Sequence, residues 1–192
     1  NHPQILKILG LSYKKLDETT NILYIMMELA KSDWHKEITM RAANKTPYTE
    51  EELLKLVHEL VSALAFLQEM NIAHRDIKPH NILIFENREI KLADFGEAKI
   101  VKMLAKKQLG TLRGTELYMA PILFQSLDSD ELVEHNPYKS DVFSLGYCIL
   151  LASTLSFNIL YDIRKLTNKK EIQDLVEKAL SKNFSDKFIT LV

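Results

Sequence analysis

Residues 74–81 have the sequence HRDIKPHN, and residues 94–96 have the sequence DFG. The first stretch is dense in polar and ionisable groups but lies between apolar segments, which is typical of a functional loop positioned by a rigid scaffold. The second follows a short strand-like segment and places a glycine, which tolerates unusual backbone angles, beside a carboxylate. Asp76, Asn81 and Asp94 together offer the hard oxygen ligands that Mg²⁺ prefers.

The segments around these stretches predict helices in the middle and at the end of the chain. Thr49 and Glu52 match the capping box that starts a helix, and apolar residues follow them at helical spacing. Residues 139–156 are apolar almost all round, which indicates a helix buried at the centre of a domain. Residues 171–180 carry apolar side chains on one face, and residues 184–192 begin another such element.

Strands are predicted in two places. Residues 5–13 and 22–27 are rich in β-branched and aliphatic side chains, and the polar residues 14–21 between them suit a turn. Two brief apolar stretches within residues 82–92 suit a small hairpin. The chain is therefore expected to be α+β, with small sheets beside a larger helical part.

The bulk composition excludes several classes of protein. With 46% hydrophobic and 27% charged residues, the 192-residue chain has the balance of one globular domain. A net charge of -1 gives no broad basic field, so no nucleic-acid partner is expected. The single cysteine, Cys148, excludes an intramolecular disulfide and favours a reducing, cytoplasmic location. The most apolar run, residues 142–152, is too short for a membrane span.

Residues 74–81 and 94–96 resemble the catalytic loop H-R-D-x-x-x-x-N and the metal-binding D-F-G of eukaryotic-type Ser/Thr protein kinases. The resemblance extends over essentially the whole chain. It implies a protein-kinase-like fold, mainly the helical C-terminal lobe plus the last strands of the small N-terminal lobe. Residues 1–27 would end the N-lobe sheet, residues 28–33 would form the hinge, and residues 34–192 would form a C-lobe truncated at its end.

The resemblance also implies catalytic roles for four residues. Asp76 would orient the substrate hydroxyl and accept its proton, and Lys78 would neutralise charge on the transferring phosphoryl group. Asn81 would hold one Mg²⁺, and Asp94 would bridge Mg²⁺ to the β- and γ-phosphates of ATP. A lysine two residues after the loop aspartate is similar to the Ser/Thr rather than the tyrosine pattern. The expected reaction is transfer of the ATP γ-phosphate to a serine or threonine hydroxyl of a protein.

Five residues are expected to bind the nucleotide because of the same resemblance. Met27 would be the gatekeeper, and Glu28 and Ala30 would lie in the hinge that bonds adenine through backbone groups. Leu83 would form the apolar floor under adenine, and Ala93 would lie in the same pocket just before residues 94–96. Outside the family match, all of these would be ordinary strand, core or surface residues.

A second group of residues is expected to regulate activity. Arg75 and Lys99 match two basic positions that grip a phosphate on the activation segment, and Thr111 lies where that phosphate would be. An unmodified threonine is the alternative at Thr111. Thr115 resembles the threonine that contacts the catalytic aspartate and lysine. His74 resembles a histidine that packs beneath the loop, so its expected role is structural.

Two departures from the family pattern leave a second functional class open. The glycine-rich loop, the strand lysine and the helix glutamate that the family needs are not in the sequence, and we expect them upstream of Asn1. Ile122 stands where the family has a glutamate that pairs with an arginine, which is expected beyond Val192. Loss of this pair should loosen the activation segment. The alternatives are therefore a kinase whose activity needs the upstream lobe and a pseudokinase that only binds partners.

Overall fold

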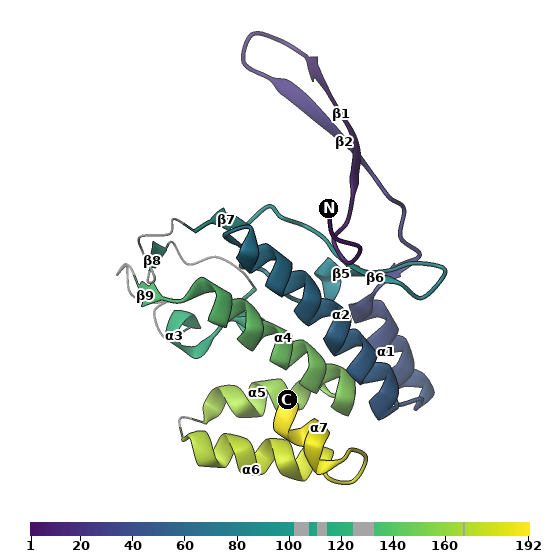
Figure 1. The fold of residues 1–192 in the computed structure, drawn as a ribbon, viewed down its shortest axis with the longest axis vertical. Coiled ribbons are helices and arrows are strands. Elements are labelled where there is room, and N and C mark those ends of the chain that lie inside the picture. The colour runs from purple at the N-terminus through teal and green to yellow at the C-terminus, as the bar shows by residue number, and fades with distance from the viewer. Residues whose placement is uncertain (102–107, 111–114, 125–132, 167) are drawn as a thin grey trace.

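The computed structural model describes residues 1–101, 108–110, 115–124, 133–166 and 168–192. It consists of a long hairpin that projects from a larger, mainly helical body (Figure 1). Small sheets and many helices occur together, as the α+β prediction requires.

The projecting hairpin pairs β1 (Ile8–Lys15) with β2 (Asn21–Met27) in antiparallel register. Its turn is stabilised by the carboxylate of Asp17, which accepts the backbone N–H groups of Thr19 and Thr20 at 2.8 Å. Every side chain of β2 is exposed. The two strands match the predicted pair, although β1 starts and ends later than expected.

The first six residues precede the hairpin and attach to the helical body. The backbone N–H of Leu6 donates to the C=O of Leu92 at 2.9 Å, and the N–H of Leu92 donates to the C=O of Gln4 at 2.8 Å. Ile5 packs against the core of the body. These contacts place residues 4–6 beside β6, whereas β1 and β2 form the hairpin.

Short strands surround the predicted catalytic loop. A three-stranded sheet has the order β3-β5-β6, formed by β3 (Ser32–Asp33), β5 (Ile82–Ile84) and β6 (Ile90–Leu92). The β5–β6 pair is the predicted small hairpin. Ser32–Asp33 were predicted in the hinge, and the structure pairs them with β5. Two further antiparallel pairs join β4 (Ile72–Ala73) to β7 (Lys99–Ile100) and β8 (Gln108–Gly110) to β9 (Val133–His135).

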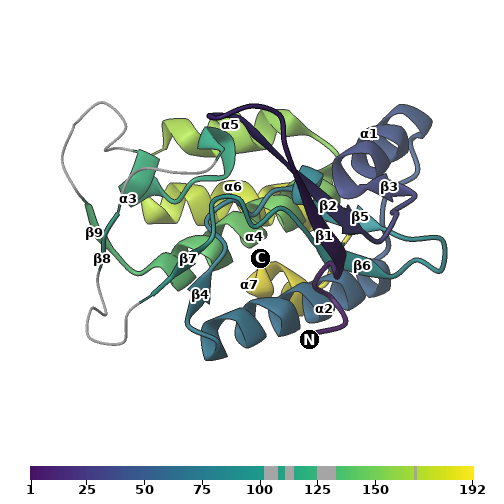
Figure 2. The ribbon, with the colours of Figure 1, turned by 90° about the horizontal axis from the view of Figure 1, so that it is seen from above.

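The helices are layered around one central helix. They are α1 (Trp34–Asn44), α2 (Glu50–Glu69), α3 (Pro121–Phe124), α4 (Pro137–Thr154), α5 (Phe157–Lys165), α6 (Lys169–Leu180) and α7 (Asp186–Leu191), with 3₁₀ turns η1 (Pro79–Asn81) and η2 (Glu116–Tyr118). Helix α4 lies between α2 and the pair α5–α6 (Figure 1). Seen from above, α1 and the β8–β9 ribbon occupy opposite ends of the body (Figure 2). Within the described residues, no helix combines the length and apolar character that a membrane crossing needs.

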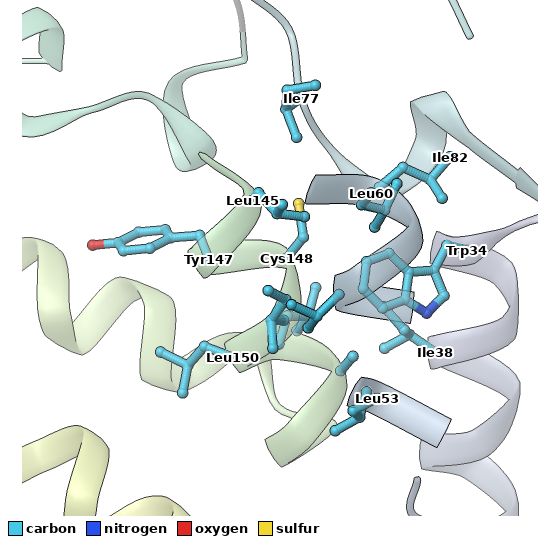
Figure 3. Packing of buried hydrophobic residues seen from close by; sticks show 14 of the residues in the cluster. Trp34, Ile38, Leu53, Leu60, Ile77, Ile82, Leu145, Tyr147, Cys148 and Leu150 are labelled. Atoms are coloured by element: carbon cyan, nitrogen blue, oxygen red, sulfur yellow. The ribbon is translucent and has the colours of Figure 1, made fainter. Parts of the chain in front are cut away.

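The core is built where α1, α2 and α4 meet. Figure 3 shows Trp34 and Ile38 from α1, Leu53 and Leu60 from α2, and Leu145, Cys148 and Leu150 from α4 packed together. The indole N–H of Trp34 donates to the hydroxyl of Tyr48 at 3.0 Å, so its one polar atom is satisfied. Burial on nearly all sides explains why α4 is apolar all round.

Helix α2 begins with the predicted capping box. The Thr49 hydroxyl accepts the backbone N–H of Glu52 at 3.2 Å, and the Glu52 carboxylate accepts the backbone N–H of Thr49 at 2.9 Å. The same carboxylate binds the guanidinium of Arg41 at 2.9 Å, which ties the start of α2 to the end of α1. The capping box therefore satisfies two N–H groups at this helix start, those of Thr49 and Glu52.

Replacing Thr49 with alanine removes the hydroxyl acceptor, so we expect the Thr49→Ala variant of the full-length protein to lose about 1 kcal/mol of stability. The melting temperature should fall by roughly 2–4 °C for a domain of this size, measured by thermal denaturation. Thr49→Ser keeps the hydroxyl and serves as the matched control. Equal melting temperatures for the alanine and serine variants would contradict the capping role.

Candidate active site

The predicted catalytic loop runs from β4 to η1 and is fixed by a carboxylate from α4. The buried side chain of Asp141 accepts the backbone N–H of His74 on one oxygen and that of Arg75 on the other, both at 2.8 Å. Burial raises the pKa of Asp141 to about 6, although the two N–H donors act in the opposite direction. Arg75 has a left-handed backbone with φ 71°, so the loop turns sharply where Asp141 holds it.

His74 joins the loop to the strand that precedes residues 94–96. Its ring is fully buried, its Nδ1 accepts the backbone N–H of Asp76 at 3.3 Å, and its Nε2 lies 3.0 Å from the C=O of Ala93. The ring also meets Phe95 edge-on at 4.8 Å. Burial lowers the pKa of His74, so the imidazole is neutral and one nitrogen accepts while the other donates. This geometry matches a structural role.

Asp76 is the centre of a compact network of charges and hydrogen bonds. One carboxylate oxygen lies 2.7 Å from Nζ of Lys78 and accepts the side-chain amide of Asn81 at 3.0 Å. The other oxygen accepts the backbone N–H of Thr115 at 3.0 Å and its hydroxyl at 2.9 Å. Burial opposes ionisation of Asp76, but the hydrogen bonds from Lys78, Thr115 and Asn81 outweigh it and lower its pKa.

Thr115 links this network to the segment that follows it. Its hydroxyl donates to Asp76 and accepts from Nζ of Lys78 at 2.8 Å, so aspartate, lysine and threonine form a closed triangle. Lys78 and Asn81 therefore both contact Asp76. The structure thus brings together three of the four predicted catalytic residues.

Asp94, the fourth, lies beside the network without bonding to it. The backbone N–H of Ala93 donates to the C=O of Asn81 at 2.8 Å, which brings the end of β6 next to η1. Asp94 has a left-handed backbone with φ 60°, an exposed side chain, and a carboxylate that accepts the N–H of Gly96 at 3.2 Å. A Cβ at Gly96 would meet that carboxylate at 3.1 Å, so glycine leaves room for it.

The residues predicted to bind the nucleotide lie at the end of β2, in the connection that follows it, in β5 and just beyond β6. Met27 ends β2 with an exposed side chain, and Ala30 is half-buried in the connection that follows. Leu83 is half-buried in β5, and Ala93 is buried just beyond β6. The carboxylate of Glu28 accepts Nζ of Lys91 at 2.7 Å, so its side chain is engaged.

Of the predicted regulatory residues, the structure places three. Lys99 lies in β7 opposite Ala73, and Arg75 follows Ala73 by two positions. Thr115 lies in the network around Asp76, and Thr111 lies outside the described residues.

Sequence reasoning missed two residues that hold this site. Asp141 was not singled out, although a lone acid inside a buried apolar helix signals a partnered carboxylate. Arg164 of α5, which binds the segment after Thr115, was also missed, because a single arginine on an amphipathic helix has no distinguishing pattern.

Comparison with known proteins agrees with this geometry. The protein kinase domain family matches residues 1–192. The chain is 34% identical over 154 residues to the serine/threonine-protein kinase fused of Drosophila melanogaster, covering 79% of this chain. It is 36% identical over 149 residues to myosin light chain kinase A of Dictyostelium discoideum, covering 76% of this chain. It is 34% identical over 151 residues to the human calcium/calmodulin-dependent protein kinase type 1B, again covering 76%.

The chain spans 17%, 45% and 38% of the lengths of these three relatives, respectively. The family match nevertheless includes every residue, and the loop, the D-F-G segment and the buried helix occur in the order that the family pattern requires. The chain therefore belongs to the protein kinase family.

Proposed function

We propose that this chain provides the catalytic lobe of an ATP-dependent protein kinase that transfers the γ-phosphate to a serine or threonine hydroxyl of a protein. The observation that carries the proposal is the network in which Lys78, Asn81 and Thr115 surround the carboxylate of Asp76. The names of the relatives, all described as kinases and one explicitly as serine/threonine-specific, support the same class.

Asp76 is suited to act on the substrate hydroxyl. Its lowered pKa keeps it ionised near neutral pH, so it accepts a hydrogen bond and then the proton of the attacking hydroxyl. Thr115 and Asn81 hold its two oxygens from different sides, which limits rotation of the carboxylate. Phosphoryl transfer depends mainly on positioning, so a carboxylate fixed in this way contributes through orientation.

Lys78 supplies the positive charge of the site. Its ammonium is shared between the carboxylate of Asp76 and the hydroxyl of Thr115, and its side chain is 22% exposed. A partly buried ammonium at this position favours negative charge on a transferring phosphoryl group more strongly than it would in open water.

Asn81 and Asp94 are suited to hold Mg²⁺. The side-chain amide nitrogen of Asn81 donates to the backbone C=O and to the carboxylate of Asp76, which leaves its amide oxygen as a ligand. Asp94 presents an exposed carboxylate from the adjacent chain segment. One amide oxygen and one carboxylate match the sparse protein ligation that Mg²⁺ accepts. When bound, the metal neutralises phosphate charge.

We assign nucleotide binding to the junction between hairpin and body. The backbone of Glu28 and Ala30 would contact adenine, with Met27, Leu83 and Ala93 as its apolar surroundings. The engaged side chain of Glu28 is compatible with this assignment, because it needs only backbone groups.

Control by phosphorylation is a further part of the proposal. A phosphate on Thr111 would bind the basic side chains of Arg75 and Lys99, and the β4–β7 pairing that places Lys99 near the loop is compatible with it. A phosphate on Thr115 would instead displace the hydroxyl from Asp76 and Lys78, so modification there should inhibit.

Changing Asp76 to asparagine removes the general base, so we expect the full-length Asp76→Asn variant to lose about 10²–10⁴-fold in kcat. Transfer of phosphate from Mg-ATP to a generic Ser/Thr peptide measures it. Asp162→Asn is the matched control, because Asp162 is exposed and forms only a surface ion pair on α5. If wild type and Asp76→Asn are equally silent while nucleotide is bound, the pseudokinase alternative replaces the proposal.

Replacing Thr115 with valine removes the hydroxyl that donates to Asp76 and accepts from Lys78. Because a hydrogen bond to a charged group contributes about 1.5–3 kcal/mol, kcat should fall roughly 10- to 100-fold. Loss of a donor also raises the pKa of Asp76, so the acidic limb of the pH–rate profile should move to higher pH. Thr115→Ser, which keeps the hydroxyl, should retain both the rate and the limb. A valine variant with an unmoved limb would refute the assigned contact.

A further inference from the structure

The backbone that follows Thr115 is held by side chains from two helices. Nη2 of Arg164 in α5 donates to the C=O of Leu117 at 2.9 Å, to that of Glu116 at 3.0 Å, and also to that of Met119. The hydroxyl of Ser144 in α4 donates to the C=O of Tyr118 at 2.7 Å. Four consecutive carbonyl groups therefore accept from side chains that lie far away in the sequence.

Arg164 is half-buried, and its guanidinium is enclosed by aromatic side chains. Its guanidinium lies over the rings of Phe124 at 4.7 Å, Tyr147 at 5.1 Å and Phe143 at 5.9 Å. Within the described residues no carboxylate pairs with it, and its buried Nε has no hydrogen-bond partner. Partial burial of a guanidinium without a counter-ion is costly, and the carbonyl groups and aromatic faces compensate for this cost.

The chain departs from the kinase pattern at Ile122 in α3, shortly after the anchored residues 116–119. Ile122, at the position where the pattern has glutamate, has a side chain that is 47% exposed and cannot form an ion pair. Arg164 instead binds main-chain carbonyls of the residues just before Ile122, and such contacts need no acidic partner. The segment thus keeps a cationic tether without the glutamate.

The tether bears directly on the site. Thr115, which contacts Asp76 and Lys78, immediately precedes the first carbonyl that Arg164 holds. Residues of the anchored segment, among them Met119, also line a small cavity together with Asp76. A protein substrate whose hydroxyl meets Asp76 must pass over this surface.

We propose that Arg164 is a positioning residue that fixes residues 116–119, so that Thr115 is presented to Asp76 and the adjoining surface is shaped for a protein substrate. The proposal rests on the proposed kinase function for its link to substrate. The tether itself is a property of the fold, and its test below does not need catalysis.

The test compares three variants of the full-length protein. Arg164→Met keeps an apolar stem on the three rings but removes every donor, and Arg164→Lys keeps the charge but loses the planar fork. Lys165→Met is the matched control, because Lys165 is the next residue of α5 and its side chain is 73% exposed. Hydrogen exchange of backbone amides and steady-state kinetics with Mg-ATP and a Ser/Thr peptide are measured for each.

Arg164→Met should speed amide exchange at residues 116–124 about tenfold or more, while amides of α2 and the middle of α4 keep their wild-type rates. The KM for the peptide should rise about tenfold, and the KM for ATP should stay unchanged. Arg164→Lys should show smaller increases in amide exchange at residues 116–124 and in the KM for the peptide. Lys165→Met should match wild type in both measurements.

Three results would overturn the proposal. One is unchanged exchange at residues 116–124 in Arg164→Met, and another is a uniform rise over the whole domain, which would mark Arg164 as general packing. The third is an equal rise in both KM values. If Arg164→Met does not fold, wild-type exchange in Arg164→Lys overturns the proposal. If wild type transfers no phosphate, the kinase function fails, and local exchange still decides whether Arg164 is the tether.

Discussion

A carboxylate inside a protein core is stable only when its oxygens find donors, and Asp141 meets this requirement with the backbone of the catalytic loop. The contact joins the most buried helix to the loop that carries the charged residues. It also fixes the left-handed turn at Arg75, beyond which Asp76 points into the network. The geometry around Asp76 therefore depends on a group that touches no reacting atom in our proposal.

Much of this architecture was predictable because its signals are local. Three features depend on neighbours in sequence, and each was confirmed. They are the capping box at Thr49, the apolar helix around Cys148 and the small hairpin of β5 and β6. The loop and D-F-G residues were predictable through their resemblance to a family, which carries spacing that physical patterns alone do not explain.

The contacts that sequence reasoning missed are long-range and involve single residues. Asp141 contacts His74, 67 positions earlier in the chain, and Arg164 contacts Met119, 45 positions earlier. Local sequence patterns such as helical periodicity or a capping box span far fewer residues, so they do not reveal these contacts. The position of the first residues also depends on a long-range contact. Ile5 looks like a strand residue, but a bridge to Leu92 decides its place.

The chain segments before and after the hairpin attach it to the body at two points. The incoming one is bonded to β6 through Leu92, and the outgoing one is bonded to β5, where the N–H of Lys31 donates to the C=O of Ile84. The two ends of the hairpin are thus attached to neighbouring strands of one small sheet, β5 and β6. That sheet leads at one end to Asn81 and Asp94, so we expect a movement of the hairpin to reach the two residues proposed to hold Mg²⁺.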